Sequence, residues 1–218
     1  MPAFVWNRLR YTVWAPVYDA IAGAAGFDEA RRRSIERLRL RAGDRVLIVG
    51  AGTGLDLPYL PSTVDLVAID VTPAMLKRLE RRAERAGRRV TARVRDARHL
   101  DFPDASFDAL VMHLVLAVMP EPERGLAEAI RVLQPGGRIA VFDKFLRDDE
   151  QPSLKRRLLN AVARPLFSDL NRRLGALIAG TSLRLEHDEP AAFGGTYRIA
   201  TLVKSREPGE ASVQAPMP

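Results

Sequence analysis

Short apolar runs alternate with amphipathic stretches along this chain. The runs at residues 46–49, 64–69, 90–94, 109–112 and 138–142 have the length and composition of buried strands. The stretches after the second and fourth runs carry apolar residues at helical spacing. Strands that alternate with helices are typical of a mostly parallel sheet, so the pattern predicts an α/β fold.

Both of these helices have recognisable ends in the sequence. The first is expected to begin with Thr72 as N-cap and Pro73 as first residue, and to stop at Gly87. Its apolar positions are Met75, Leu76, Leu79, Ala83 and Ala86. The second carries Leu126, Ile130 and Leu133 and is expected to stop at Pro135-Gly136-Gly137.

Two further strands are predicted near the C-terminus. They cover residues 183–188 and 197–204, and residues 189–196 are expected to join them as a loop. Residues 205–218 contain three prolines and little to bury, so a disordered tail is predicted there.

The first strand runs into a glycine-rich turn. Gly50, Gly52 and Gly54 follow it directly, and such a turn lets backbone N–H groups approach a nucleotide-like ligand. The dinucleotide fingerprint wants its third glycine at a position that Leu55 occupies here. The turn therefore departs from the NAD pattern.

Polar side chains follow the next three strands as well. Asp70 closes the second strand, twenty residues after Gly50, where a carboxylate can accept both hydroxyls of a ribose. Asp96 follows the third strand and could accept the exocyclic amine of an adenine, while His113 ends the fourth. Both NAD and S-adenosylmethionine carry that ribose.

Four ordered blocks of sequence carry a family resemblance. They are Gly50-Ala51-Gly52-Thr53-Gly54, residues 68–76, residues 101–108 and residues 131–137. Together they resemble the class I S-adenosylmethionine-dependent methyltransferases. The resemblance implies a Rossmann-like, seven-stranded mixed sheet with helices on both faces and the last strand antiparallel. Many members have an acid two residues before the first glycine, but this chain has Ile48 there.

The turn, the strand ends and the resemblance together predict a set of residues that bind S-adenosylmethionine. The set consists of Tyr18, Gly50, Ala51, Gly52, Thr53, Gly54, Asp70, Val71, Met75, Asp96, Ala97 and His113.

A narrower resemblance concerns the methyl acceptor. Residues 15–19 and 50–58 are similar to bacterial phosphatidylethanolamine N-methyltransferases and related small-molecule methyltransferases. In these enzymes the Tyr-Asp pair lies in an N-terminal segment that folds over the cofactor, so Tyr18 is expected to touch the methionine end or orient the acceptor. Tyr18 and His113 are the candidate catalytic residues, since either could take a proton from an amine. The alternative for His113 is a hydrogen-bonded core histidine.

Basic residues are concentrated in one segment. The chain has a formal charge of +7, and residues 151–175 hold six basic residues against Asp169 alone. Apolar residues recur every four positions there, which predicts two basic amphipathic helices that Pro165 separates. Residues 1–14 mix aromatic side chains with Arg8 and Arg10. Both segments suit an anionic membrane surface. Alternatively, both pack on the domain.

The length fits a single domain with an N-terminal extension. We expect residues 1–27 to form a helical lid or membrane-contact segment, residues 28–204 the methyltransferase domain with a basic helical insertion at about 147–180, and residues 205–218 the tail. The chain has no cysteine, and its three scattered histidines predict no metal site. Its longest apolar stretch, residues 110–119, is too short to cross a bilayer, so a cytoplasmic protein, peripheral at the inner membrane face, is expected.

Three hypotheses for function follow. The first is N-methylation of a phosphatidylethanolamine-type lipid. The second keeps the cofactor site and takes a quinone or a soluble small molecule as acceptor. The third, a nucleic-acid methyltransferase or binding module, is least favoured, because the fourth strand ends in Met112-His113-Leu114-Val115 and not in an Asn-Pro-Pro-Tyr type motif.

Overall fold

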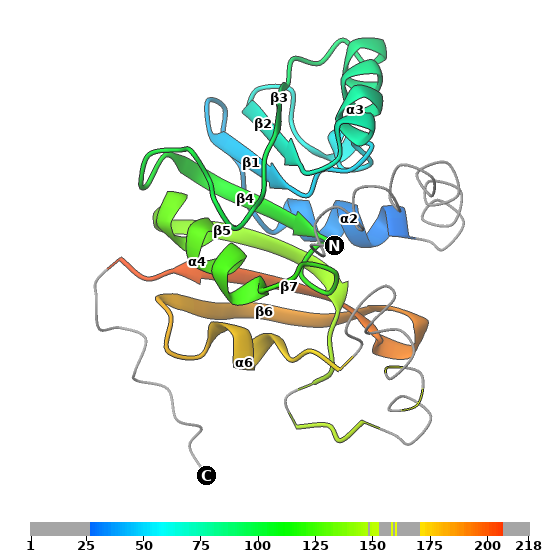
Figure 1. The fold of residues 1–218 in the computed structure, drawn as a ribbon, viewed down its shortest axis with the longest axis vertical. Helices are drawn as coiled ribbons and strands as arrows, with labels where there is room; N and C mark the ends of the chain where they lie inside the picture. Colours follow the sequence, from blue (N-terminus) through cyan, green and yellow to red (C-terminus); the bar gives the residue numbers. More distant parts are fainter. Residues whose placement is uncertain (1–26, 148, 153–157, 159, 161–170, 207–218) are drawn as a thin grey trace, which may run out of the picture.

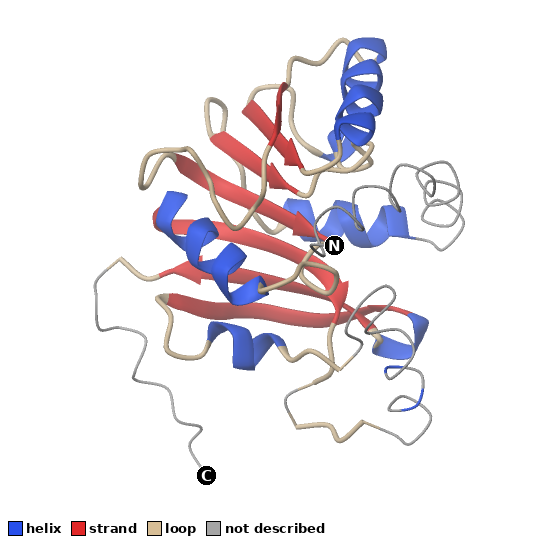
Figure 2. Ribbon diagram, in the orientation of Figure 1, coloured by secondary structure: helices blue, strands red, loops and turns tan. Residues whose placement is uncertain are grey.

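A computed structural model describes residues 27–147, 149–152, 158, 160 and 171–206, which form a seven-stranded sheet with helices on both faces (Figures 1 and 2). The helices are α2 (Phe27–Glu36), α3 (Pro73–Arg85), α4 (Pro122–Val132) and α6 (Leu174–Ile178), with two 3₁₀ turns, η1 (Leu57–Tyr59) and η2 (Phe193–Gly195). The strands are β1 (Arg45–Val49), β2 (Asp65–Asp70), β3 (Thr91–Val94), β4 (Phe107–His113), β5 (Leu133–Lys144), β6 (Leu183–Ala192) and β7 (Tyr197–Lys204).

The strand order is β3-β2-β1-β4-β5-β7-β6. β3, β2, β1, β4 and β5 pair in parallel, whereas β7 runs antiparallel to both of its neighbours. The predicted α/β fold, with seven strands and an antiparallel last strand, is therefore confirmed. The chain reverses its direction of travel across the sheet between β1 and β4, and in open α/β sheets ligands bind at such a point, outside the carboxyl ends of the strands.

Alternate residues of the central strands build two cores. In β1, Val46 and Ile48 pack with buried residues of α3 and of the segment that follows α2. Leu47 and Val49 face the other way and pack with the apolar sides of α4 and α6. A parallel strand buried on both faces reads as one continuous apolar run, which is the pattern seen in the sequence.

The end of α4 differs from its prediction. The helix stops at Val132, and Leu133 already belongs to β5, where it pairs with Phe107. The register between these strands shifts before the next pair, Ala109 and Arg138. Pro135 and the two glycines therefore lie within an irregular start of a long strand and do not end the helix.

The loop predicted at residues 189–196 is also shorter than expected. β6 continues to Ala192, and Pro190 lies opposite Arg198 in β7. Proline is tolerated at this position because β6 is an edge strand and needs no hydrogen bond on its outer side.

Several predicted segments lie wholly or mostly outside the described residues. These are residues 1–26, residues 207–218 and most of the basic segment 151–175. The N-terminal lid, the two basic helices, their membrane contact and the disordered tail therefore stay predictions. Within residues 171–180, α6 is a single short helix, and Arg173 bridges to Leu146.

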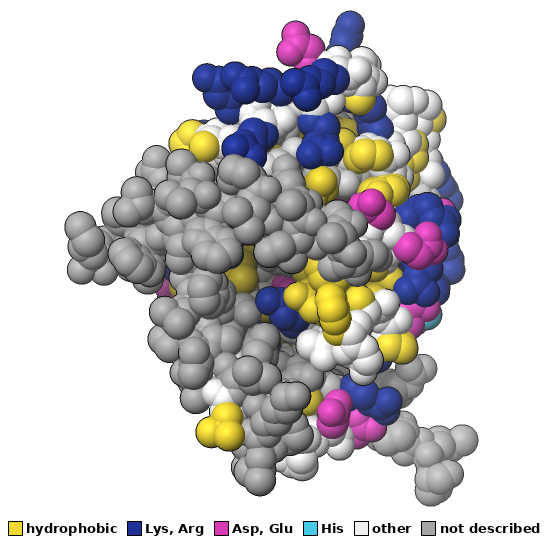
Figure 3. Space-filling view, turned by 90° about the vertical axis from the view of Figure 1, so that its right-hand side faces the viewer, with side chains coloured by type: hydrophobic (Ala, Val, Ile, Leu, Met, Phe, Trp, Pro, Cys, Tyr) yellow, Lys and Arg dark blue, Asp and Glu magenta, His cyan; other side chains and the backbone are white. Residues whose placement is uncertain are grey.

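Helix α3 covers the part of the sheet nearest β3, and its outer side is basic. Figure 3 shows Lys and Arg side chains gathered over the top of this face of the molecule, where α3 lies. None of the helices in the described parts of the chain is long and apolar enough to span a bilayer.

Candidate functional site

The predicted cofactor residues converge on one edge of the sheet. Gly50 follows β1, Asp70 ends β2, Asp96 follows β3 and His113 ends β4. These four strands are neighbours and parallel, so their carboxyl ends form a row with about 4.8 Å between strands. The row lies at the crossover point where this type of sheet binds its ligand.

The glycine turn has a tightly packed side and an open side. Gly50, Gly52 and Gly54 all adopt positive φ, at 68°, 53° and 82°. A Cβ on Gly50 would lie 2.6 Å from Val115, and one on Gly54 would lie 3.0 Å from Leu79. At Gly52, no atom of the described residues lies within 4 Å of the Cβ position. The open side at Gly52 is therefore where a ligand can approach the backbone.

Asp70 is held in place from the inner side. Its Oδ2 accepts the N–H of Gly52 at 2.9 Å and its Oδ1 accepts the N–H of Thr72 at 2.8 Å. Burial raises the pKa of Asp70, against the effect of these two hydrogen bonds and of weaker ones from the Thr72 side chain and the Val71 backbone. The side chain is only partly buried, and a carboxylate has about four acceptor positions. Asp70 can therefore accept hydroxyl groups while it anchors the glycine turn.

Asp96 already has a partner. The guanidinium of Arg98 lies 2.7 Å from its Oδ2, and the N–H of Arg98 donates to Oδ1. Partial burial would raise the pKa of Asp96, but the hydrogen bonds from Arg98 hold it below its ordinary value. An adenine amine would have to share this carboxylate with Arg98.

The remaining predicted cofactor residues differ in exposure. Val71 is partly exposed, whereas Ala51, Thr53, Met75 and Ala97 are buried. Buried positions of this kind shape the turn and the wall of the site. Tyr18 lies outside the described residues, so its role stays a prediction.

A buried polar cluster lies directly behind the glycine turn. Oδ1 of Asp56 accepts from Arg31 at 2.7 Å and lies 2.7 Å from Nδ1 of His113. Nε2 of His113 lies 3.0 Å from the hydroxyl of Ser34. All four residues are at most 5% exposed. The cluster therefore ties α2, the glycine turn and the end of β4 together.

The charge of Asp56 is compensated within this cluster. Burial would raise its pKa, but Arg31 and His113 outweigh that effect and hold the pKa well below its usual range. With a proton on Nδ1, His113 donates to Asp56 and accepts the Ser34 hydroxyl at Nε2. Both ring nitrogens are thus engaged, which matches the alternative of a hydrogen-bonded core histidine. A proton-accepting role would require one of these contacts to break.

The sequence analysis missed Arg31, Ser34 and the contacts of Asp56. A signal was present in α2, where the buried positions Phe27, Ala30, Arg31, Ser34 and Ile35 recur at helical spacing. An arginine and a serine on an otherwise apolar helix face indicate buried polar partners.

Asp143 and Lys144 end β5. Asp143 is fully buried, and its oxygens accept the backbone N–H groups of Ala117 and Lys144. Burial raises the pKa of Asp143 and lowers that of Lys144. The ammonium of Lys144 lies 5.6 Å from the centre of the Tyr197 ring. Asp143 therefore fixes the loop that follows β4.

An aromatic cluster lies beside the carboxyl ends of β4 and β5. Phe27 packs against Phe142, Tyr197 and Phe193, and the Phe142 ring centre is 5.8 Å from that of His113. Phe193 is 64% exposed. Burial raises the pKa of Tyr197 to about 12, so its hydroxyl keeps its proton at neutral pH. The rim next to His113 thus offers apolar surface to an acceptor.

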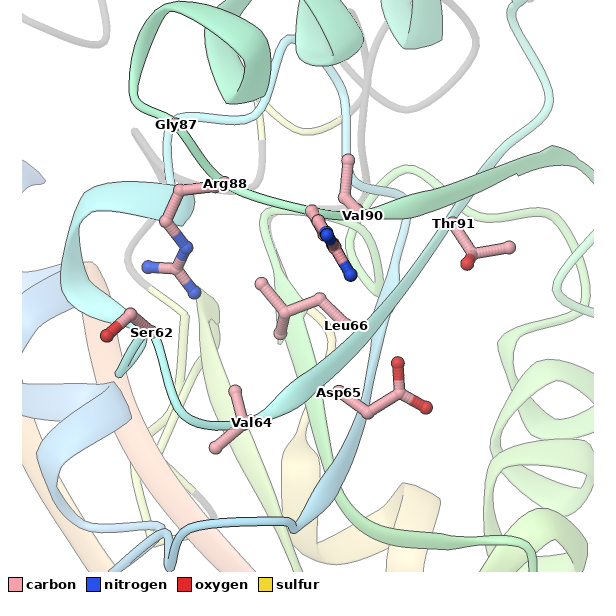
Figure 4. Close-up of a pocket in the computed structure, with 9 residues that line it drawn as sticks. Ser62, Val64, Asp65, Leu66, Gly87, Arg88, Val90 and Thr91 are labelled. Carbon is pink, nitrogen blue, oxygen red and sulfur yellow. The ribbon is translucent and has the colours of Figure 1, made fainter.

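A cavity of 420 Å³ lies elsewhere, at the amino ends of β2 and β3 (Figure 4). Ser62, Asp65 and Thr91 line it together with Arg88. The guanidinium of Arg88 is bound to the carbonyl oxygens of Leu57, Leu60 and Pro61, so this side chain braces the loop before β2. The cavity is at the opposite edge of the sheet from the glycine turn.

Comparisons with known proteins agree with this geometry. A family model described as a methyltransferase domain matches residues 47–141. The phosphatidylethanolamine N-methyltransferase of Cereibacter sphaeroides is 33% identical over 189 residues, which cover 86% of this chain and 92% of that enzyme. The demethylmenaquinone methyltransferase of Deinococcus radiodurans is 33% identical over 199 residues, which cover 88% of this chain and 80% of that enzyme.

Solved structures share the fold. The [4+2]-cyclase SpnF aligns with a TM-score of 0.76 and 20% identity over 91% of this chain and 94% of its own. At this identity the likeness shows the fold alone, because one fold can carry different reactions.

Proposed function

Because the chain belongs to the class I S-adenosylmethionine-dependent methyltransferases, we propose that it transfers the methyl group to the amine of a phosphatidylethanolamine-type lipid. S-adenosylmethionine is its cofactor and supplies an electrophilic methyl group when bound. The open side of Gly52 and the partly exposed carboxylate of Asp70 fit the nucleoside part of this cofactor.

The observation that carries the lipid proposal is the 33% identity that extends over 92% of a phosphatidylethanolamine N-methyltransferase. The aromatic cluster around Phe27 and Phe193 supports an acceptor with an apolar body, because it places apolar surface beside the end of β4. The aromatic cluster supports an apolar acceptor whatever the head group of that acceptor is.

For methyl transfer, the protein mainly has to align the acceptor with the methyl group of the cofactor. An amine attacks the methyl group through a neutral lone pair, so the chain must hold the acceptor in line and keep bulk water from its path. His113 and Asp56 contribute by fixing the end of β4 against the glycine turn. The amine proton passes to solvent, and Tyr18, whose position by resemblance is next to the acceptor, can accept a hydrogen bond from the amine.

A quinone is the second candidate acceptor. The demethylmenaquinone methyltransferase of Deinococcus radiodurans has the same 33% identity and covers a similar share of this chain. A quinone with its isoprenoid tail also has an apolar body, so the aromatic cluster does not separate the two candidates.

One competition experiment separates them. Purified full-length chain receives S-adenosylmethionine with a labelled methyl group and mixed vesicles that contain phosphatidylethanolamine and demethylmenaquinone, reduced to its quinol, in equal amounts. Mass spectrometry of the extract then counts labelled methyl groups on each acceptor. The Asp70→Ala variant, which is expected to lose cofactor affinity, is the matched control for transfer by contaminants.

Labelled mono-, di- or trimethylated head groups that depend on Asp70 support the lipid proposal. Label on the quinone alone overturns it in favour of the second candidate. If neither acceptor is labelled while calorimetry shows cofactor binding, both proposals fail and the enzyme class stands.

A further inference from the structure

One continuous stretch carries a net positive charge as large as that of the whole chain. Residues 73–95 contain nine arginines and lysines and two glutamates, a net charge of +7. The rest of the chain contains 25 basic and 25 acidic residues. The net positive charge of the whole chain therefore equals that of the stretch that contains α3, β3 and the turn between them.

The basic side chains of helix α3 lie in lines along its exposed side. Lys77, Arg81 and Arg85 are four residues apart and exposed, so they form one line along the helix. Arg78 and Arg82 form a second line beside the first. The buried residues of the helix lie on its other side, namely Met75, Leu76, Leu79 and Ala83. We call the five basic side chains the α3 basic face.

Several arginines in other described parts of the chain have acidic partners. Arg32 is paired with Glu29 and Glu36, and Arg138 with Glu186. Within the described residues no ion pair joins Lys77, Arg81 or Arg85 to a carboxylate. Like charges four residues apart destabilise a helix, so the line of Lys77, Arg81 and Arg85 carries a cost that an external anion removes.

The α3 basic face is linked to the cofactor turn. Nε of Arg82 donates to the carbonyl oxygen of Thr53 at 3.0 Å, and α3 begins three residues after Asp70. A surface that holds α3 is therefore held close to the site of methyl transfer.

We propose that the α3 basic face docks the enzyme on anionic lipid head groups. A straight, exposed line of cations on one helix matches a flat layer of phosphates. Residues 73–95 contain no aromatic side chain, so base stacking, on which single-stranded nucleic acid binding relies, is not available there. The choice of a lipid partner rests on the proposed function, but docking is measured without methyl transfer.

The test compares two triple variants of the full chain. Lys77→Gln, Arg81→Gln and Arg85→Gln remove three charges from α3 and keep good helix formers. The matched control, Arg41→Gln, Arg184→Gln and Arg206→Gln, removes three exposed charges from other elements. Sedimentation measures binding to vesicles of phosphatidylethanolamine and phosphatidylglycerol and to vesicles of phosphatidylcholine alone, at two salt concentrations. Circular dichroism verifies that every variant is folded.

We expect the α3 variant to bind anionic vesicles about 100-fold more weakly than the wild type, and the control to change by less than about threefold. Binding to phosphatidylcholine should be weak for all three proteins. Equal losses in both variants, or unchanged binding of the α3 variant, overturn the proposal. It is also overturned if the α3 face binds double-stranded RNA more tightly than anionic vesicles at the same salt concentration.

The two proposals fail separately. Docking through α3 by a wild type that does not methylate phosphatidylethanolamine supports the docking surface and overturns the lipid substrate. If the protein methylates phosphatidylethanolamine but its binding to vesicles does not depend on the α3 charges, the docking surface is overturned. The proposed function then stays intact.

Discussion

The polar groups at the carboxyl edge of the sheet fall into two regions of opposite character. In the open region, Gly52 has free space at its Cβ position and Asp70 is partly exposed. In the closed region behind it, Asp56 and His113 are at most 5% exposed and fully occupied with each other, Arg31 and Ser34.

This difference shows that a polar residue at the carboxyl edge of the sheet need not bind a ligand. Asp70 and Asp56 are both aspartates near the same turn, yet Asp56 is buried and only Asp70 is exposed enough for a ligand to reach its carboxylate. Changes in the closed region should therefore reduce stability, and changes in the open region should reduce cofactor affinity.

The largest effect is expected from Arg31→Met. The substitution leaves the Asp56 carboxylate buried without its main counter-charge, which should lower the free energy of unfolding by about 3–5 kcal/mol. Urea denaturation at pH 7 measures this. Arg32→Met, one residue further along α2 with exposed partners, is the control and should change stability little. Equal losses would mean that the cluster has no special role.

Gly52→Val tests the open region. A branched side chain at φ 53° fills the space through which the cofactor approaches, so the affinity for S-adenosylmethionine should fall at least about 100-fold. Calorimetry measures the loss. Gly87→Val introduces the same residue at φ 61°, also with open space, but at the far end of α3. If both variants lose affinity alike, strain explains the effect and the open side has no link to the cofactor.

Asp70→Ala should weaken cofactor binding about 10- to 100-fold, since it removes hydrogen bonds to a charged acceptor and loosens Gly52. Asp65→Ala changes an exposed aspartate at the other end of the same strand and should bind normally. An unchanged dissociation constant for Asp70→Ala would remove this residue from the site.

The smallest expected effect is on the pH dependence of stability. The pKa of Asp56 is lower in the folded protein than its unfolded value of about 3.9, so its contribution to stability is full above that pH and is lost as the pH falls toward the folded pKa. The stability difference between wild type and Asp56→Asn should therefore shrink by about 1 kcal/mol between pH 5 and pH 3. Urea denaturation at these two pH values tests the sign, and a growing difference would contradict it.

Much of the fold and the open region could be predicted from the sequence. Apolar runs place β1, β2 and β4, and a glycine turn followed by an acid at a strand end is a local pattern. The extension of β6 through Pro190 depends on which strand lies at the sheet edge, and that is a property of the whole sheet.

The closed region could not be predicted for a similar reason. Arg31 and Asp56 are 25 residues apart and Ser34 and His113 are 79 apart, so their contacts exist only after α2 has packed against the sheet. The position of Tyr18 and the membrane role of residues 1–14 and 151–175 remain predictions, since most of these residues lie outside the described part of the chain.

The concentration of net charge in residues 73–95 has a consequence for crowded surfaces. Because the rest of the chain sums to no net charge, this stretch contributes a large share of the repulsion between copies in solution. A surface that neutralises it leaves bound copies with almost no net charge toward one another. Their packing density there is then limited by the size of the molecule and not by mutual repulsion.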